Sequence, residues 1–191
     1  FDNQADLRGV YDKRHLVPFG EYVPFRSWVP FLDIIAGPAD FVASAKNNLI
    51  YVPGIGQVQT LICYEVIFAG HVLDPHMRPD LIVNVTNDAW FGATIGPWQH
   101  LYQSQMRAVE EGVPLFRVAN TGISAAFDGF GRELGSIPLG ESAYLDIPIP
   151  SVLTAPVFAR FGNVGFFALC LGLSCAAWVL YRREKQKVLK A

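Results

Sequence analysis

The chain has 191 residues, 51% of them hydrophobic, a net charge of -2 and a mean hydropathy of +0.27. This length allows one domain of ordinary size plus an appendage, and the near-neutral charge gives no support for a nucleic-acid partner. The sequence has no initiator methionine and no signal peptide, so we expect it to begin in the middle of a longer protein.

Residues 11–24 combine charged, apolar and turn-forming residues. Two prolines and a glycine keep this segment out of a helix interior and predict a fixed loop that leaves a short strand. Lys13, His15 and Glu21 are ionisable groups in a setting of Leu, Val, Phe and Tyr. Such charges either face solvent or are paired, and both alternatives stay open.

Residues 25–41 are too apolar for an ordinary surface loop, and Pro30 and the Gly37-Pro38 pair divide them into short pieces. One interpretation is a core helix packed on a sheet. The other is an amphipathic segment that lies against lipid, which would bring Trp28, Phe31 and Ile35 to the membrane surface.

Cys63 lies at the junction of two predicted elements. Residues 49–53 and 57–63 are expected to form a hairpin of two strands, and residues 66–73 recur at helical spacing up to Asp74-Pro75. A strand-to-helix turn leaves free backbone N–H groups that favour a negative charge, and thiolate is the nucleophilic form of cysteine. The alternative is that Cys63 is a small buried hydrophobic residue.

The remaining elements alternate between strand and helix. Residues 81–86 form an apolar run typical of a doubly covered strand, and the segment at its carboxyl end, residues 87–92, lies where α/β sheets bind ligands. The pattern predicts an α/β layered sheet with late antiparallel hairpins. The further predicted elements are a helix over 97–111 stopped by Gly112, a strand over 114–119, a hairpin of 123–127 with 132–137, and a last strand over 142–149.

Residues 162–181 contain no charge, and a basic cluster follows at once. About 20 apolar residues suffice for a helix to cross a bilayer, and positive flanks mark the cytoplasmic side. The predicted domains are therefore a catalytic domain over 1–155, a linker over 156–161, a transmembrane helix over 162–181 and a cytoplasmic tail over 182–191. Cys170 and Cys175 fall inside the apolar span, which leaves Cys63 as the only thiol of the remaining part.

Several kinds of chemistry lack their motifs. There is no glycine-rich phosphate loop, no G-x-S-x-G turn, and no His or Cys spacing that suits a metal; no cofactor is expected. What is left is Cys63 with a lysine and carboxylates. Such a set fits attack on an acyl carbon, in which a thiolate adds, a carboxylate takes its proton and an ammonium stabilises the oxyanion.

The sequence resembles the nitrilase, or carbon–nitrogen hydrolase, superfamily through Cys63 after an apolar strand and Lys13 on an earlier one. Four stretches, residues 11–24, 62–65, 87–92 and 96–100, further resemble the apolipoprotein N-acyltransferase family. The resemblance implies an αββα sandwich, incomplete at its N-terminus, that faces the periplasm from the bacterial inner membrane. It also implies acyl transfer from a phospholipid, phosphatidylethanolamine above all, to the N-terminal amine of a diacylglyceryl-cysteine lipoprotein.

The same resemblance assigns roles to residues. Cys63 is the expected nucleophile and Lys13 the oxyanion-stabilising residue, while Glu21 and Glu65 match accessory carboxylates and Tyr64 matches the residue beside the nucleophile. The expected substrate-binding residues come from position in the chain: the apolar segment supplies Trp28, Phe31 and Ile35, and the end of the 81–86 strand supplies Asn87, Asp88, Trp90 and Phe91.

One departure from the family pattern concerns the general base. The family's general-base glutamate lies upstream of the lysine strand, and no Glu precedes Lys13 here. The chain therefore looks like the C-terminal part of a longer enzyme. Two other hypotheses are a nitrilase-type amidase and a non-enzymatic, membrane-anchored binding module. The apolar span argues against the amidase, and the lone Cys63 argues against the binding module.

Overall fold

A mixed sheet of six strands, which follow one another in sequence order, forms the centre of the protein. The structure is a computed structural model that describes residues 4–24, 41–45, 49–74 and 77–188. β2, β3 and β4 are parallel, and antiparallel hairpins extend the sheet at both sides, which confirms the strands predicted between residues 49 and 137. The strand expected to carry Lys13 is wrong, because residues 4–24 form only an isolated bridge between Pro18 and Tyr22. The strands are β1 (Ile50–Val52), β2 (Gly56–Ile62), β3 (Leu81–Asn87), β4 (Leu115–Asn120), β5 (Ser124–Phe127) and β6 (Glu133–Ile137).

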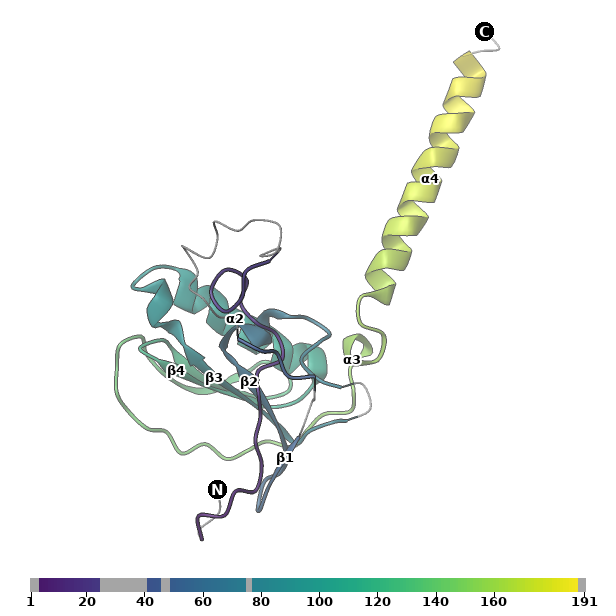
Figure 1. Ribbon diagram of the computed structural model, residues 1–191. Helices are drawn as coiled ribbons and strands as arrows, with labels where there is room; N and C mark the ends of the chain where they lie inside the picture. Colours follow the sequence, from purple (N-terminus) through teal and green to yellow (C-terminus); the bar gives the residue numbers. More distant parts are fainter. Residues whose placement is uncertain (1–3, 25–40, 46–48, 75–76, 189–191) are drawn as a thin grey trace.

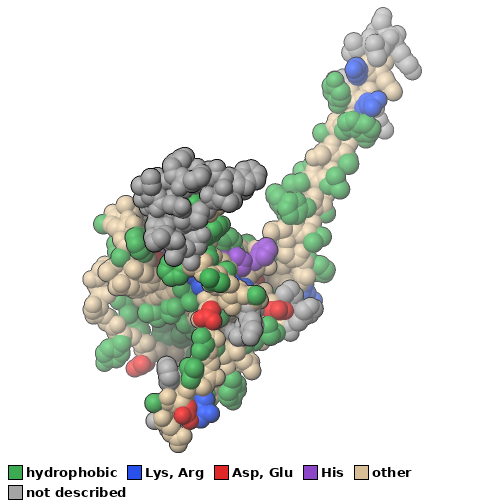
Figure 2. Space-filling view, viewed as in Figure 1, with side chains coloured by type: hydrophobic (Ala, Val, Ile, Leu, Met, Phe, Trp, Pro, Cys, Tyr) green, Lys and Arg blue, Asp and Glu red, His purple; other side chains and the backbone are tan. Residues whose placement is uncertain are grey.

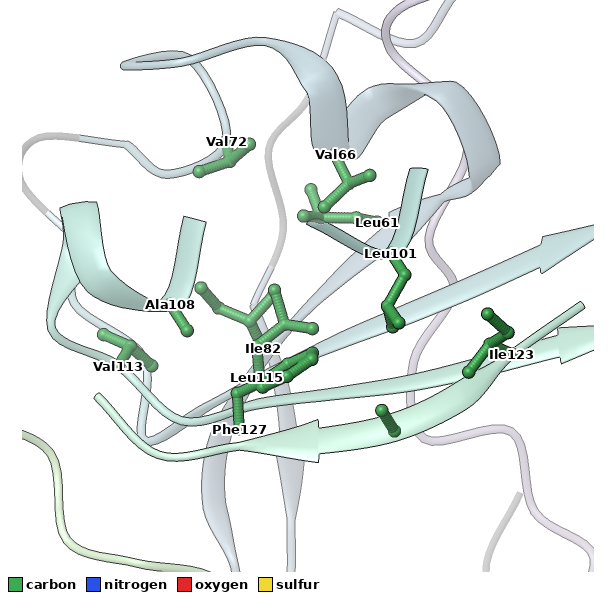
Figure 3. Packing of buried hydrophobic residues seen from close by; sticks show 11 residues of the cluster. Leu61, Val66, Val72, Ile82, Leu101, Ala108, Val113, Leu115, Ile123 and Phe127 are labelled. Carbon is green, nitrogen blue, oxygen red and sulfur yellow. The ribbon is translucent and has the colours of Figure 1, made fainter. Parts of the chain in front are cut away.

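Helix α2 (Gly96–Glu111) packs across one face of this sheet (Figure 1). Pro97 suits the first turn, where a backbone N–H is not needed, and Gly112 ends the helix in the left-handed conformation at φ 63°. Leu101 and Ala108 point from α2 toward the sheet (Figure 3). Each fully buried large aliphatic side chain stabilises the fold by about 1.5–3 kcal/mol, so this face of α2 fixes the helix on the sheet.

The sheet face beneath α2 changes from apolar to polar along the strands. Ile82 pairs with Leu115 at the apolar end, and two residues further on Asn84 pairs with Arg117. Both polar side chains are almost fully buried. Because side chains alternate along a strand, this register places Asn84 and Arg117 on the same face as the hydrophobic core. They lie toward the carboxyl ends of the parallel strands.

The predicted helix over residues 66–73 is wrong. The chain forms only a short 3₁₀ helix, η3 (Cys63–Ile67), and Gly70 then turns at φ 72°. Arg107 donates to the carbonyl oxygen of Ile67 at 3.0 Å, and Arg14 donates to that of His71 at 2.9 Å. These carbonyl groups are satisfied by side chains from distant segments, and the backbone beyond Ile67 does not continue as a helix.

The predicted strand over residues 142–149 is also wrong. This segment has no ladder partner and crosses the face of the sheet opposite α2, where Leu145 and Ile147 approach Gly135 of β6. Pro148 and Pro150 supply no N–H group for pairing. The alternating apolar residues therefore cover the sheet and do not extend it.

The C-terminal part consists of α3 (Val157–Phe161), inside the predicted linker, and the long helix α4 (Val164–Val188). Residues 164–182 of α4 are long and apolar enough to cross a membrane, with a mean hydropathy of 2.0 and no burial against the rest of the described protein. α4 projects away from the sheet (Figure 1), with apolar side chains along its length and Lys and Arg side chains near its far end (Figure 2). This is the only such candidate span in the described part of the chain.

Candidate active site

Cys63 stands at the sharp turn where β2 ends and η3 begins. Its backbone adopts φ 52°, the left-handed region that costs a non-glycine residue about 1–2 kcal/mol. The side chain is half-buried, and the sulfur forms no disulfide. A strained turn that presents a free thiol at a strand end matches the position expected for a nucleophile.

Glu65 joins the Cys63 turn to the loop that carries Lys13. Its carboxylate accepts hydrogen bonds from the backbone N–H groups of Arg14 at 2.7 Å, His15 at 3.1 Å and Ile62 at 2.7 Å, and from the Tyr11 hydroxyl at 3.0 Å. The residue is 1% exposed. Burial, followed by the Glu65 charge and hydrogen bond, raises the pKa of Tyr11. Tyr11 therefore remains a donor, and Glu65 holds two distant segments in register.

Lys13 is paired with Glu21 in the loop held by Glu65. The Lys13 Nζ lies 2.6 Å from Glu21 Oε1, and Glu21 Oε2 accepts the backbone N–H of Val17 at 2.8 Å. The Lys13 side chain is only 12% exposed. The structure thus resolves the alternatives for this loop: its lysine is a partly buried, paired cation.

Tyr64 lines an apolar hollow beside the Cys63 turn. Its ring packs edge-on against Phe68 with 5.2 Å between the ring centroids. The hollow has a volume of about 630 Å³. Its other walls come from Arg14, His15, Leu16, Pro18, Tyr22, Phe41 and Ala43. An apolar group bound next to Cys63 could be accommodated here.

A buried polar network lies beneath Cys63. Arg117 forms an ion pair with Asp88, and both side chains are fully buried. Burial by itself raises the pKa of Asp88, but the hydrogen bond with His100 and the Arg117 charge outweigh it, so this pKa lies below its usual value. Burial lowers the pKa of Arg117, and the charges of Asp88 and Cys63 oppose this. Arg117 also donates to Asn84 Oδ1 at 2.7 Å.

The residues predicted to bind substrate do not form one group. Asp88 belongs to the buried network, whereas Asn87 caps η4 (Asp88–Phe91) by accepting the Ala89 N–H at 3.1 Å. Trp90 is 86% exposed, and Phe91 places its ring edge against His100. Trp28, Phe31 and Ile35 lie outside the described residues. Within the described ranges, no three His, Cys, Asp or Glu side chains are arranged to hold a metal ion.

Sequence reasoning missed the members of the network other than Asp88. A charge at Arg117, inside an otherwise apolar strand, was the available signal, because such a charge needs a buried partner. Asn84 in the preceding strand gave a similar signal. His100 lies in a stretch that carries the family resemblance, but no sequence pattern indicates a role for it.

The comparisons with known proteins agree with this fold. The sequence profile of the carbon-nitrogen hydrolases matches residues 1–153. Two solved structures share the fold: Nit3 of Saccharomyces cerevisiae, a member of the nitrilase superfamily, at TM-score 0.52 and 17% identity, and a carbon-nitrogen hydrolase from Helicobacter pylori at 0.54 and 12%. Both alignments cover 74% of this chain, and they cover 48% and 52% of the respective structures. The chain belongs to the carbon-nitrogen hydrolase family.

Curated relatives with higher identity carry one name, apolipoprotein N-acyltransferase. The protein from Bradyrhizobium diazoefficiens is 43% identical over 85% of this chain and 31% of its own length. The proteins from Rhizobium rhizogenes and Rickettsia bellii are 45% and 46% identical, over 90% and 81% of this chain and 33% and 31% of their own lengths. The chain thus spans about a third of the length of these relatives.

The Glu65 contacts predict the effect of Glu65→Gln. In this variant an NH₂ group replaces a carboxylate oxygen that accepts backbone N–H groups. Each buried N–H left without an acceptor lowers the free energy of unfolding by about 1–3 kcal/mol. We expect a lower melting temperature together with lower activity. Glu133→Gln, which changes an exposed carboxylate bonded to Ser136, is the matched control and should leave both unchanged. A Glu65→Gln protein as stable and active as wild type would contradict this role.

Proposed function

We propose that this chain is the catalytic part of a membrane N-acyltransferase with Cys63 as nucleophile. The observation that carries the proposal is the free, half-buried Cys63 thiol at φ 52°, to which Glu65 docks the Lys13 loop. The naming of the relatives supports acyl transfer to an apolipoprotein. The substrates are then a phospholipid donor, phosphatidylethanolamine foremost, and a lipoprotein with an N-terminal diacylglyceryl-cysteine.

The first half-reaction forms a thioester. The Cys63 sulfur attacks the ester carbonyl of the phospholipid as its proton passes to a carboxylate base. The Lys13 ammonium, helped by the Tyr64 N–H, stabilises the oxyanion of the tetrahedral intermediate. Collapse of the intermediate breaks the ester C–O bond, and the proton returns to the departing lysophospholipid oxygen. The apolar hollow lined by Tyr64 and Phe68 is the site that we assign to the acyl chain.

The second half-reaction transfers the acyl group to nitrogen. The lipoprotein amine attacks the thioester carbonyl, loses a proton to the base and forms an amide, and Cys63 leaves as a thiol. We place the base outside the described residues. Glu65 already accepts several hydrogen bonds, and Glu21 is paired with Lys13. A base must have a free oxygen within reach of the thiol.

The placement in the membrane follows from α4. We assign residues 1–155 to the catalytic domain, 156–161 to the linker, 162–181 to the membrane and 182–191 to the cytoplasm. The catalytic domain then lies on the periplasmic side of the bacterial inner membrane. The basic cluster after residue 181 and the unburied apolar helix support this orientation.

Amide hydrolysis is the second candidate, because the matching family profile is that of carbon-nitrogen hydrolases. The same thiol would attack an amide, and water would release the acid. An apolar helix with no cover inside the described protein favours a lipid substrate. Incubation of the full-length protein with phosphatidylethanolamine, with and without an amine-bearing diacylglyceryl peptide, separates the two: amide product supports transfer, and free fatty acid as the sole product overturns it.

Changes at Cys63 test the nucleophile. We expect Cys63→Ala to abolish acyl transfer in the full-length protein and Cys63→Ser nearly to do so, because a hydroxyl is a far weaker nucleophile without a strong base. The measurement is amide formation together with the mass of the acyl-enzyme, which neutral hydroxylamine should remove. Cys170→Ala, in the apolar helix, is the control. Cys63→Ala turnover above about a tenth of wild type, well beyond uncatalysed chemistry, removes Cys63 from this role.

Lys13→Arg tests the oxyanion donor. Arginine keeps the charge but replaces a compact ammonium with a planar fork on a longer stem, so the donor misses the oxyanion. One such contact is worth about 3 kcal/mol, and we expect a loss of about 100-fold in the rate of acyl-enzyme formation. Arg132→Lys, at an exposed arginine that pairs with Asp128, controls for the exchange itself. Near-normal turnover in Lys13→Arg means that Lys13 supplies only general positive charge.

A further inference from the structure

The carbonyl group of Cys63 is held from below by two side chains of the buried network. Asn84 Nδ2 lies 3.4 Å from this oxygen, and His100 Nε2 lies 3.3 Å from it. Asn84 also donates to the Leu61 carbonyl at 3.2 Å, so it spans the end of β2. The peptide group that follows the strained residue therefore has partners from both β3 and α2.

His100 is itself fixed by the ion pair. Its Nδ1 lies 2.9 Å from Asp88 Oδ1, which also accepts the Thr86 hydroxyl at 3.1 Å, and Asp88 Oδ2 is bound by Arg117. The Asp88 carboxylate and the Cys63 carbonyl can only accept hydrogen bonds. Both ring nitrogens therefore lie next to hydrogen-bond acceptors, and the two contacts together fix the orientation of the ring. Phe91 closes the outer side, leaving His100 only 6% exposed.

These contacts bear on the direction of the thiol. At φ 52° Cys63 has the left-handed backbone conformation, which local sterics disfavour. Contacts with surrounding residues must therefore hold it in place. Glu65 fixes the residue before Cys63 by accepting the Ile62 N–H, and the buried network fixes the carbonyl group of Cys63 itself. Because the backbone is held on both sides of the Cys63 Cα atom, the direction of the Cα–Cβ bond is fixed.

We infer that His100 is a positioning residue, which couples the buried Asp88–Arg117 ion pair to the Cys63 carbonyl and so aims the thiol at the acyl carbon. This inference rests on the proposed role of Cys63 as nucleophile. Asp88 then acts below the site as the group that orients His100. The Arg117 charge adds an electrostatic interaction with Cys63, a second connection between the same network and the thiol.

Two substitutions of His100 separate positioning from stability. The Nδ2 of Asn can take the place of the ring Nδ1, so His100→Asn keeps a donor for Asp88 and loses the donor to Cys63. The longer Gln places its Nε2 near the ring Nε2, so His100→Gln keeps the donor to Cys63 and loses the Asp88 contact. A misplacement of about 1 Å can lower a rate 10²-fold. We therefore expect His100→Asn to slow acyl-enzyme formation by about 100-fold and His100→Gln by less than about fivefold.

The measurement is single-turnover acylation of the full-length protein with phosphatidylethanolamine in detergent micelles, with the donor concentration varied. Half-saturation should change less than about threefold in both variants, since positioning affects the chemical step and leaves ground-state binding in place. Melting temperatures should fall equally in both. Gln105→Ala, which removes another donation from α2 to a backbone carbonyl, is the control and should acylate at the wild-type rate.

The outcomes distinguish this inference from the proposed function. Equal rates in the two His100 variants, or rates that follow the melting temperatures, overturn positioning even when wild type carries a hydroxylamine-labile acyl group on Cys63. Absence of that group in wild type overturns the proposed function, and the inference with it. If the His100 variants do not fold, Thr86→Val decides. Loss of its hydroxyl loosens Asp88 and should slow acylation by about three- to tenfold, the size expected for one hydrogen bond, and an unchanged rate overturns the inference.

Discussion

The buried carboxylate of Glu65 is the interaction on which the candidate site depends. It accepts N–H groups from Arg14 and His15 on one side and from Ile62 on the other, so segments about fifty residues apart meet at one side chain. Buried polar groups in proteins are hydrogen-bonded, and this carboxylate supplies the acceptor for donors from both segments. The loop of Lys13 and the turn of Cys63 are thus placed by a single group, before any substrate binds.

Sequence reasoning found the parts of the site that depend on local pattern. Runs of β-branched residues indicated the strands, and the junction after Ile62 indicated the turn that carries the Cys63 thiol. Residues 66–73 have the periodicity of a helix, and residues 142–149 have that of a strand. Contacts with distant segments nevertheless give each of them a different structure. Arg107 donates to the carbonyl groups of Val66 and Ile67, and Arg14 donates to that of His71. The role of Arg117 depends on Asp88, 29 residues earlier in the chain, and no local pattern contains that pairing.

The two described glutamates near Cys63 differ in what their oxygen atoms can still do. Both Glu65 oxygens are occupied by neutral donors, which fits a structural anchor. Glu21 instead faces the Lys13 ammonium, so it sets the position of the cation. A carboxylate oxygen that already accepts hydrogen bonds or contacts a cation is not free to contact the thiol, as a general base must. In the proposed mechanism, the proton of the Cys63 thiol therefore passes to a third carboxylate.

Some side chains of helix α2 pack in the hydrophobic core, and others belong to the buried polar network below Cys63. Its Leu101 and Ala108 pack on the apolar end of the sheet, whereas His100 and Ser104 face the polar end below Cys63. Replacing a buried ion pair such as Asp88–Arg117 with well-packed apolar residues is often neutral or stabilising in proteins. Such a core would leave the Cys63 carbonyl without the donor that Asp88 orients. Stability alone does not require the buried charges of Asp88 and Arg117. In our inference they are explained by the geometry that they impose on the Cys63 turn.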